Sequence, residues 1–411
     1  MSNQIWKHLV FTCTSLGITL KPSLGPAHNI GELSRPDWFG SRAKAGIRWS
    51  AMFALLALGA VSAGLGQSAA TGTTRQTNPV AKLPRDQARE DWRNAMLHNP
   101  PQKEKCSTSS YPEKQWHEVP CGPAPKPPVA PRKLIRPHVG GELNNDLTFK
   151  VENGYIVDAE GSFDKVAGVT SEQSNSTPNA FSLQLNTNIF KTSACNGSPA
   201  QSTCRGWVQF VYTSSGKYAF IQYWLIGYGS TCPAGWASDG DYNCSRNSHT
   251  VNIPAMTIAD LRKLKLYGVI GDDWGIPNPD SVAIQIGDAF YEETSGDPIA
   301  GARAGWQEME FNVFGDGGST NAVFNPGSTL TVRDSILLGT GNTYTCTDNG
   351  TSGESNNLIL SAKSPLEAEV GPPSLVFIES NAKGTVYGGC KSAVVIGETH
   401  HFPAPIVPHR P

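Results

Sequence analysis

The stretch Gly206-Trp-Val-Gln-Phe-Val-Tyr-Thr213 alternates side chains of different character, and the segment 218–228 does the same after a short turn that contains Gly216. Successive side chains of a β-strand point to opposite faces of the sheet, so this alternation predicts two β-strands. In the first strand one face carries Val208, Phe210 and Tyr212, and the other carries Trp207, Gln209 and Val211.

The second strand and a later one repeat this division. Between 218 and 228, one face carries Tyr218, Phe220, Gln222, Trp224 and Ile226, opposite Ala219, Ile221, Tyr223 and Leu225. In the segment 306–314 an apolar set, Met309, Phe311 and Val313, opposes Trp306, Glu308, Glu310 and Asn312. Three strands therefore each present a face that combines tryptophan with amide or carboxylate groups.

Short runs of this kind recur throughout the chain from residue 147 onward. They lie at 147–157, 181–190, 206–213, 217–228, 266–270, 281–293, 306–314, 329–338, 356–361 and 374–380, separated by clusters of Gly, Asn, Ser and Pro. Many short strands joined by turns indicate an all-β protein, here a β-sandwich of the concanavalin- or jelly-roll-like kind with disulfide-closed loops. We expect this domain to span residues 138–390 and to be followed by a disordered tail over 391–411.

Composition excludes some classes of function. The chain has 411 residues with 33 Lys plus Arg against 35 Asp plus Glu, a formal net charge of −2. No excess of positive charge attracts it to nucleic acid or to anionic lipid, so a nucleic-acid partner is not expected.

Residues 1–70 resemble a leader region. An apolar stretch at about 52–66 follows Arg42, Lys44 and Arg48, and small residues at 61–63 and 68–70 offer two cleavage sites. This pattern predicts a signal peptide, export to a secreted or extracytoplasmic location, and no stable membrane span after processing. An uncleaved anchor or a buried core helix is the alternative.

The cysteines favour the same interpretation. Cys13 precedes the apolar stretch, whereas eight cysteines follow it: Cys106, Cys121, Cys195, Cys204, Cys232, Cys244, Cys346 and Cys390. An even number can pair fully in an oxidising compartment, and the short spacings suggest 106 with 121, 195 with 204 and 232 with 244, which leaves 346 and 390. No spacing resembles a Cys-x-x-Cys metal motif, so neither a metal nor another cofactor is expected.

Residues 71–137 differ from the β region in composition. They contain one candidate helix at 85–98 and a proline-rich end, Cys121 to Pro137. Proline favours extended conformations, so this end predicts a semi-rigid linker. We interpret the segment as a propeptide-like or accessory part, separable from the β domain.

The faces that mix tryptophan with polar groups suit a cleft, because unpartnered carboxylates are costly to bury. In one interpretation a carboxylate activates a water and an amide stabilises the oxyanion at a scissile carbonyl. In another, the aromatic rings stack on a bound polymer while the polar groups form hydrogen bonds with it. Ordinary amphipathic strands with solvated Glu308 and Glu310 are the third possibility.

The segments 180–186, 207–211, 219–225 and 306–311 together resemble the strand succession of the eqolisins, which are secreted glutamic peptidases with a β-sandwich fold and a propeptide. The resemblance covers about 150 residues. Eqolisins hydrolyse peptide bonds with a Gln and a Glu from different strands. The resemblance implies that Gln209 takes the role of the Gln and Glu310 that of the Glu, with Glu308 as the other match.

The sequence thus predicts an exported endopeptidase that uses a Gln/Glu pair to activate water, with an extracellular protein or polysaccharide as its partner. The residues expected around the substrate are Trp207, Gln222, Trp224, Trp306 and Asn312. The alternative function is a non-catalytic module that binds carbohydrate or a cell surface through the same face. A purely structural exported protein is a third possibility.

Overall fold

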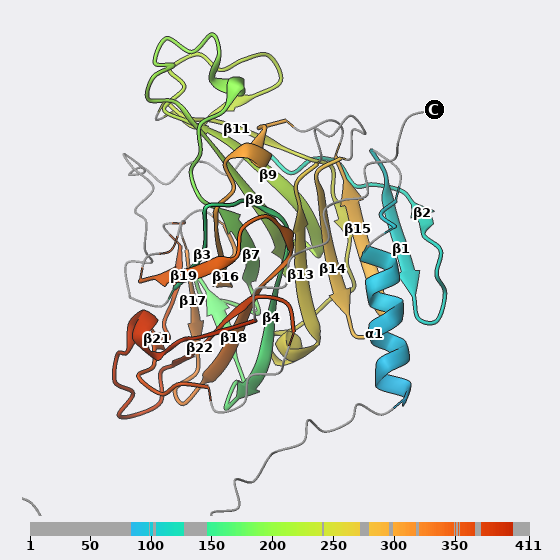
Figure 1. Ribbon diagram of the computed structural model, residues 1–411, viewed down its shortest axis with the longest axis vertical. Helices are drawn as coiled ribbons and strands as arrows, with labels where there is room; N and C mark the ends of the chain where they lie inside the picture. Colours follow the sequence, from blue (N-terminus) through green and yellow to red (C-terminus); the bar gives the residue numbers. More distant parts are fainter. Residues whose placement is uncertain are drawn as a thin grey trace, which may run out of the picture. The chain divides into compact units, whose positions relative to one another are not determined.

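The computed structural model describes residues 84–97, 99–101, 104–126, 146–240, 242–271, 279–295, 299–317, 320–348, 350, 352, 354–365 and 371–397. Strands dominate this part of the chain, and two antiparallel sheets contain most of them (Figure 1). The predicted leader over 1–70 lies outside the described residues.

The first sheet has the order β2-β1-β15-β14-β13-β4-β18-β22-β21, with β23 also paired to β22. Its neighbouring strands are antiparallel throughout. The bounds are β1 Cys106–Ser110, β2 His117–Val119, β4 Ile156–Ala167, β13 Leu264–Val269, β14 Ser281–Ile286, β15 Ala289–Thr294, β18 Thr329–Gly339, β21 Ile359–Leu360, β22 Ser374–Ser380 and β23 Val394–Ile396.

The second sheet has the order β10-β11-β9-β8-β7-β16-β3-β19, with β12 paired to β9. Its bounds are β3 Thr148–Glu152, β7 Phe181–Thr187, β8 Arg205–Thr213, β9 Tyr218–Ile226, β10 Ala237–Ser238, β11 Cys244–Asn247, β12 Val251–Asn252, β16 Glu308–Gly315 and β19 Thr343–Thr347. A small sheet joins β5 Glu172–Ser174, β6 Thr177–Pro178, β17 Asn321–Phe324 and β20 Ser355–Asn356.

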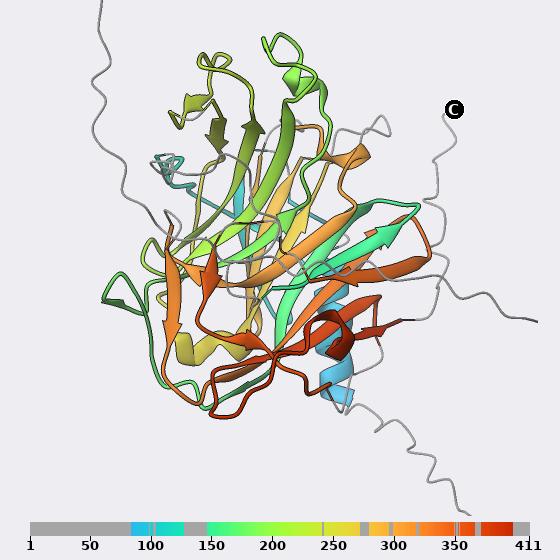
Figure 2. The same cartoon turned by 90° about the vertical axis from the view of Figure 1, so that its left-hand side faces the viewer.

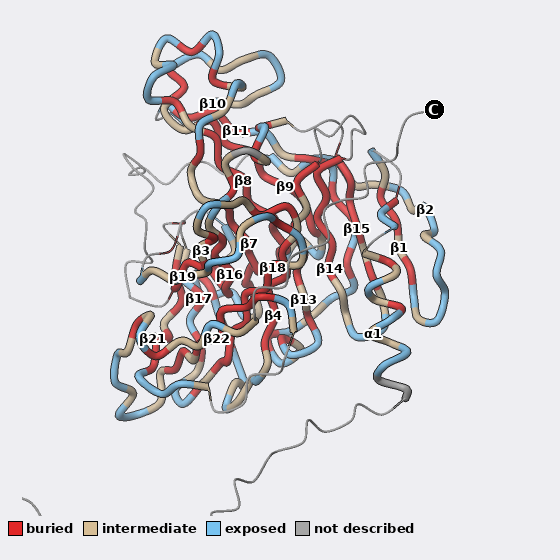
Figure 3. The backbone as a smooth tube through the Cα atoms, in the orientation of Figure 1, coloured by how far each residue is buried: buried red, intermediate tan, exposed pale blue. Residues whose placement is uncertain are grey.

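The two large sheets pack against each other through an apolar core. Phe163 of β4 and Phe311 of β16 have ring centroids 5.3 Å apart, so the two sheets meet at this point. Gly161 of β4 leaves room for the ring of Phe311, because a Cβ there would lie 2.0 Å from it. Buried residues follow the strands of both sheets (Figure 3). The predicted all-β, sandwich-like architecture is therefore confirmed.

Strand register confirms the predicted faces of β8 and β9. Trp207 lies opposite Trp224 and Gln209 opposite Gln222, so the mixed faces of the two strands coincide. On β16, Phe311 faces the core, which places Glu310 and Asn312 on the other side. These positions follow from local alternation alone.

Trp306 departs from the prediction. It is fully buried in the apolar core, and its ring centroid lies 5.8 Å from that of Phe210. The period-two rule fails here because β16 begins at Glu308, so Trp306 precedes the regular strand. Its indole Nε1 donates to the backbone carbonyl of Glu308 at 2.9 Å. Trp306 is therefore a core residue that anchors the start of β16.

The helix α1 packs on the first sheet, and the strands β1 and β2 belong to it. The helix α1, Pro84–Leu97, agrees with the helix predicted over 85–98 and buries Trp92 and Met96 against Tyr267, Ala283 and Phe290. Strands β1 and β2 extend the sheet beyond β15 at its edge. The expected boundary at 137/138 lies outside the described residues, and separability stays a prediction.

Strand β23 continues the first sheet beyond Cys390. Residues 394–396 pair with β22, where the sequence interpretation expects a disordered tail to have begun. The prediction is wrong for these residues, because their backbone groups complete the ladder of an otherwise exposed strand edge. Residues 398–411 of the expected tail lie outside the described residues.

The eight cysteines of the described residues form the pairs expected from their spacing. Disulfides join Cys106 to Cys121, Cys195 to Cys204, Cys232 to Cys244 and Cys346 to Cys390. The disulfides Cys195–Cys204 and Cys232–Cys244 close the loops before β8 and after β9. These loops lie at the same end of the two strands (Figure 2). Such pairing is typical of an oxidising, extracytoplasmic environment. Within the described segments, no helix is long and apolar enough to cross a membrane.

Candidate functional site

A row of polar side chains crosses the second sheet on the side away from the core. Glu310 of β16 lies opposite Asn186 of β7, Asn186 opposite Gln209 of β8, and Gln209 opposite Gln222 of β9. Residues directly opposite each other in antiparallel strands share a face and lie close enough for their side chains to interact. Four strands therefore contribute one continuous polar row.

Hydrogen bonds connect this row. Gln209 Nε2 donates to Asn186 Oδ1 at 3.1 Å and to Gln184 Oε1 at 2.9 Å. Asn186 Nδ2 in turn donates to Glu310 Oε2 at 3.0 Å. The amide of Gln209 and the carboxylate of Glu310 are thus joined through Asn186.

The Trp224 indole fixes the orientation of two amides. Its Nε1 donates to Gln209 Oε1 and to Gln222 Oε1, each at 3.0 Å. An indole nitrogen can only donate, so both glutamines must turn their oxygens toward it and their NH₂ groups away. Gln222 Nε2 then donates to Asn247 Oδ1 at 3.0 Å. Trp224 therefore sets the direction in which Gln209 presents its NH₂ group.

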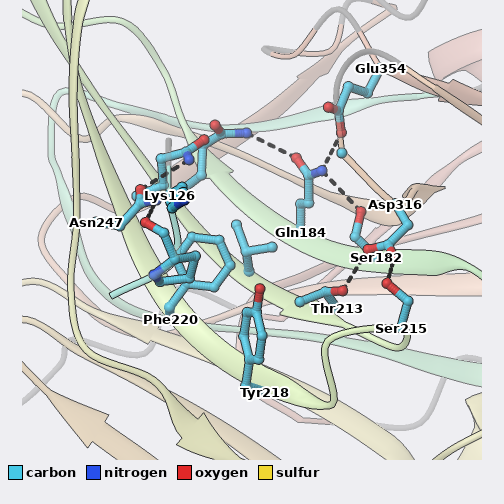
Figure 4. Close-up of a pocket in the computed structure, with 15 residues that line it drawn as sticks. Lys126, Ser182, Gln184, Thr213, Ser215, Tyr218, Phe220, Asn247, Asp316 and Glu354 are labelled. Carbon is cyan, nitrogen blue, oxygen red and sulfur yellow. Dashed lines mark hydrogen bonds between the residues drawn. The ribbon is translucent and has the colours of Figure 1, made fainter. Parts of the chain in front are cut away.

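A pocket of about 230 Å³ lies over this part of the sheet (Figure 4). Its lining includes the amides of Gln184, Gln209 and Gln222 and the rings of Tyr218 and Phe220. The remaining lining residues are Pro125, Lys126, Ser182, Val211, Thr213, Ser215, Asn247, Asp316, Gly317 and Glu354. Amides, hydroxyls, aromatic rings and carboxylates thus converge on one space, as in many ligand-binding sites.

Part of the proline-rich segment lies at the rim of the pocket. Gly122 pairs with Thr250 through backbone hydrogen bonds, and Asn247 Nδ2 donates to the carbonyl of Pro125 at 3.0 Å. The disulfide from Cys106 to Cys121 ties this segment to β1. The stretch of chain that includes Pro125 and Lys126 is therefore held against the pocket through its backbone.

Glu310 is closed off from the pocket. It is 0 % exposed, its Oε2 accepts from Ser352 N at 3.0 Å, and its Oε1 accepts from Ser352 Oγ at 3.3 Å. A Cβ at Gly350 would lie 2.0 Å from Oε1, so glycine allows the backbone to approach the carboxylate closely. Glu310 does not belong to the pocket lining.

Further carboxyl groups lie near Glu310 in the interior. Asn312 Nδ2 donates to Asp146 Oδ1 at 2.7 Å and to Glu379 Oε2 at 3.1 Å. Burial raises the pKa of Glu379 to about 8. Burial, followed by the charges of Glu310 and Glu379, raises the pKa of Asp146 and that of Asp334 well above their usual range. Because their pKa values are raised, these carboxyl groups stay protonated up to a higher pH than exposed carboxyl groups do.

The other residues expected at the site have structural contacts. Trp207 and Trp224 are 6 % and 4 % exposed, and the Trp207 indole donates to the carbonyl of Thr187 at 2.8 Å. Glu308 lies 3.9 Å from Lys150, and burial raises its pKa while Lys150 opposes this shift. Asn312 donates hydrogen bonds to the buried carboxyl groups of Asp146 and Glu379. Of the expected site residues, Gln209 and Gln222 line the pocket.

Several residues that line or support the pocket were not predicted as site residues. Gln184 and Asn186 alternate with Leu183 and Leu185 on β7, so period two marks them as one polar face. Glu354 lies in a segment between strands, where no periodic signal exists. Its position in the pocket depends on the fold.

No cation site is evident among the residues that the structure describes, since no group of three or more His, Cys, Asp or Glu side chains could hold a metal ion. No protein-family model matches the chain, and no curated protein matches it either.

Proposed function

We propose that this protein is a secreted glutamic-type endopeptidase that hydrolyses a polypeptide in the pocket above β7, β8 and β9. The observation that carries the proposal is the position of Gln209. Its amide lines the pocket, is oriented by Trp224, and is connected through Asn186 to a carboxylate. A concanavalin- or jelly-roll-like sandwich, as the strand spacing predicts, would provide a rigid sheet for such a group.

The chemistry needs a base and an oxyanion donor. A carboxylate accepts a proton from water as the water oxygen attacks the carbonyl carbon, and an amide N–H stabilises the negative charge that develops on the carbonyl oxygen. Gln209 provides such an amide within the pocket, and its Nε2 donates to Gln184 and to Asn186. The oxyanion would take the place of one of these two acceptors. The eqolisin resemblance assigns the base to Glu310, which is connected to Gln209 through Asn186, or to Glu308, which lies 3.9 Å from Lys150. Neither carboxyl group lines the pocket.

Extended polypeptide is the substrate class that the rim favours. Asn247 donates to the backbone carbonyl of Pro125, and Thr250 exchanges backbone hydrogen bonds with Gly122. Both contacts are made to backbone atoms, which every extended peptide carries. A substrate chain would make these contacts in place of residues 122–125.

A second function is supported by the aromatic rings that line the pocket. Tyr218 and Phe220 line the pocket, and aromatic rings with nearby amides bind sugars as well as peptides. Trp207 and Trp224 are less suited to stacking on a ligand, because both side chains are more than nine-tenths buried. A non-catalytic carbohydrate- or surface-binding module would therefore rely on Tyr218 and Phe220.

The proposal is tested with the secreted protein and a reduced, carboxymethylated protein as substrate, at pH values from about 3 to about 8. We expect cleavage products from the native chain. Gln209→Ala should lower turnover by about 100-fold to 1000-fold, because it removes an oxyanion donor. Thermal unfolding of the variant shows whether it is folded.

Absence of cleavage by the native chain at every pH would contradict the peptidase proposal. Binding of an insoluble polysaccharide that is lost in Tyr218→Ala but retained in Gln209→Ala would then support the binding module.

A further inference from the structure

Four stretches of the chain have the pattern Asn-x-Ser/Thr with a middle residue other than proline. They are 175–177 (Asn-Ser-Thr), 196–198 (Asn-Gly-Ser), 243–245 (Asn-Cys-Ser) and 349–351 (Asn-Gly-Thr). In an exported protein the asparagine amide of this pattern accepts an oligosaccharide when it lies on a surface loop. Asn349 and Thr351 lie outside the described residues. The surroundings of the other three asparagines distinguish them from one another.

Asn175 lies at the tip of a short hairpin. Ser174 of β5 pairs with Thr177 of β6, so Asn175 and Ser176 form a two-residue turn. Their φ angles of 47° and 65° match a type I′ turn, which asparagine tolerates better than most residues do. Asn175, Ser176 and Thr177 are all exposed, and Asn175 Nδ2 donates no hydrogen bond to another described residue. The acceptor amide is therefore accessible in the folded chain.

Asn196 lies on the surface of a loop that the disulfide Cys195–Cys204 closes. It directly follows the 3-10 helix at 193–195, and its side chain is exposed. Its Oδ1 accepts a hydrogen bond from Gln201 Nε2 at 2.8 Å, which leaves Nδ2 without a partner among the described residues. The nitrogen that would carry a sugar is therefore available here as well.

Asn243 differs from these two, because the fold uses its amide. The residue is 3 % exposed. Its Nδ2 donates to Asp239 Oδ2 at 2.7 Å, and its Oδ1 accepts from Gly227 N at 2.9 Å. The following residue, Cys244, is buried in a disulfide with Cys232. A sugar on Asn243 Nδ2 would break a buried hydrogen bond and has no room in this loop, so the folded chain excludes it.

We propose that Asn175 and Asn196 are N-glycosylation sites of the exported chain and that Asn243 is not. The proposal is independent of the peptidase function. It requires export, which the leader pattern predicts and with which the four disulfides agree.

The modification is a group transfer without oxidation or reduction. The donor is an oligosaccharide linked to a polyprenyl diphosphate. Asparagine Nδ2 forms a bond to the anomeric carbon of the first sugar as the bond between that carbon and the diphosphate oxygen breaks. The lipid diphosphate leaves with the bonding electron pair, and Nδ2 gives up one of its two protons.

The experiment expresses the full chain in a eukaryotic host and maps the secreted protein by peptide mass spectrometry. An amidase that removes N-linked glycans converts each modified asparagine to aspartate, so peptides are compared before and after this treatment. We expect the conversion at Asn175 and Asn196 and an intact asparagine at Asn243. Asn342, an exposed asparagine outside the pattern, is the matched control and should stay unmodified.

Substitution of Thr177 separates the pattern from the asparagine. Thr177→Ala leaves Asn175 in place but should abolish its modification, so the secreted protein loses one glycan, whereas Thr177→Ser should keep it. Asn196→Gln should remove the other glycan. Thermal unfolding shows whether each variant is folded.

Three results would overturn the proposal. An unmodified Asn175 or Asn196 in the secreted native chain overturns the assignment of that site, whatever the peptidase activity. A glycan on Asn243 contradicts the argument from burial. A chain that stays inside the cell without glycans contradicts the export on which both sites depend.

Discussion

Asn186 Nδ2 donates a hydrogen bond of 3.0 Å to Glu310 Oε2, its direct neighbour across β7 and β16. This contact places an amide between a buried carboxylate and the pocket amide of Gln209. A neutral partner that both donates and accepts satisfies groups on either side without adding charge. The polar row depends on this property of asparagine.

Asn186→Leu should therefore destabilise the protein. The change removes a donor to Glu310 and an acceptor for Gln209, and loss of buried hydrogen-bond partners costs about 1–3 kcal/mol. Urea unfolding measures the difference in free energy. Asn342→Ala, at an exposed position, should stay within about 0.5 kcal/mol of the native chain. Equal midpoints for both variants would show that the bridge does not stabilise the fold.

The buried carboxyl groups should make the fold more stable in acid than in mild alkali. Burial raises the pKa of Glu172, Glu292, Glu293 and Glu379 to about 8 each. A carboxyl with a raised folded-state pKa contributes stability below its unfolded value of about 4.3, and this contribution is lost as pH rises toward 8. We expect Tm to fall by at least about 2–4 °C between pH values of about 5 and 8.

The pKa of Glu160 is shifted in the opposite direction. The charges of Lys265 and Arg93 overcome the effect of burial and lower its pKa to about 2. Its contribution is present above about pH 4.3 and lost as pH falls through about 2. Calorimetric scans across pH test both directions. Glu379→Gln mimics the protonated group and should reduce the fall in Tm above pH 5, whereas an unchanged profile would contradict the assignment.

Asn247→Ala should loosen the segment at the rim of the pocket. The variant loses the hydrogen bond to the Pro125 carbonyl, while Gly122 keeps its backbone bond to Thr250. Hydrogen–deuterium exchange of residues 121–126 should therefore become faster at Lys126 than at Gly122. Asn342→Ala serves as the control. Uniform exchange across the segment in both variants would mean that Asn247 does not hold it.

Trp92→Ala should cost about 3–5 kcal/mol, because it removes a large buried side chain. Trp92 packs against Phe290 with ring centroids 5.3 Å apart, and its indole donates to the Glu113 carbonyl at 2.5 Å. Trp116→Ala, at a partly exposed position, should cost less. Denaturant unfolding distinguishes them. An unchanged midpoint in Trp92→Ala would support a separable segment 71–137.

Local pattern predicted the parts of this protein that depend on neighbours in sequence. Alternation placed Trp207, Gln209, Gln222 and Trp224 on one face, and the register of β8 and β9 confirms it. Cysteine spacing predicted the disulfide pairs, since short loops bring nearby cysteines together. The α1 helix followed from a run of helix-favouring residues that ends before Pro100.

Tertiary structure decided which of these residues reach the pocket. Alternation cannot tell an open face from one covered by another segment, so Glu310 looked available although Gly350 and Ser352 enclose it. Trp306 turned into the core because the strand begins two residues after it. Glu354 joined Gln184 from a segment without periodicity, 170 residues away in sequence. Such contacts are set by how the chain packs over the sheet, which no local pattern encodes.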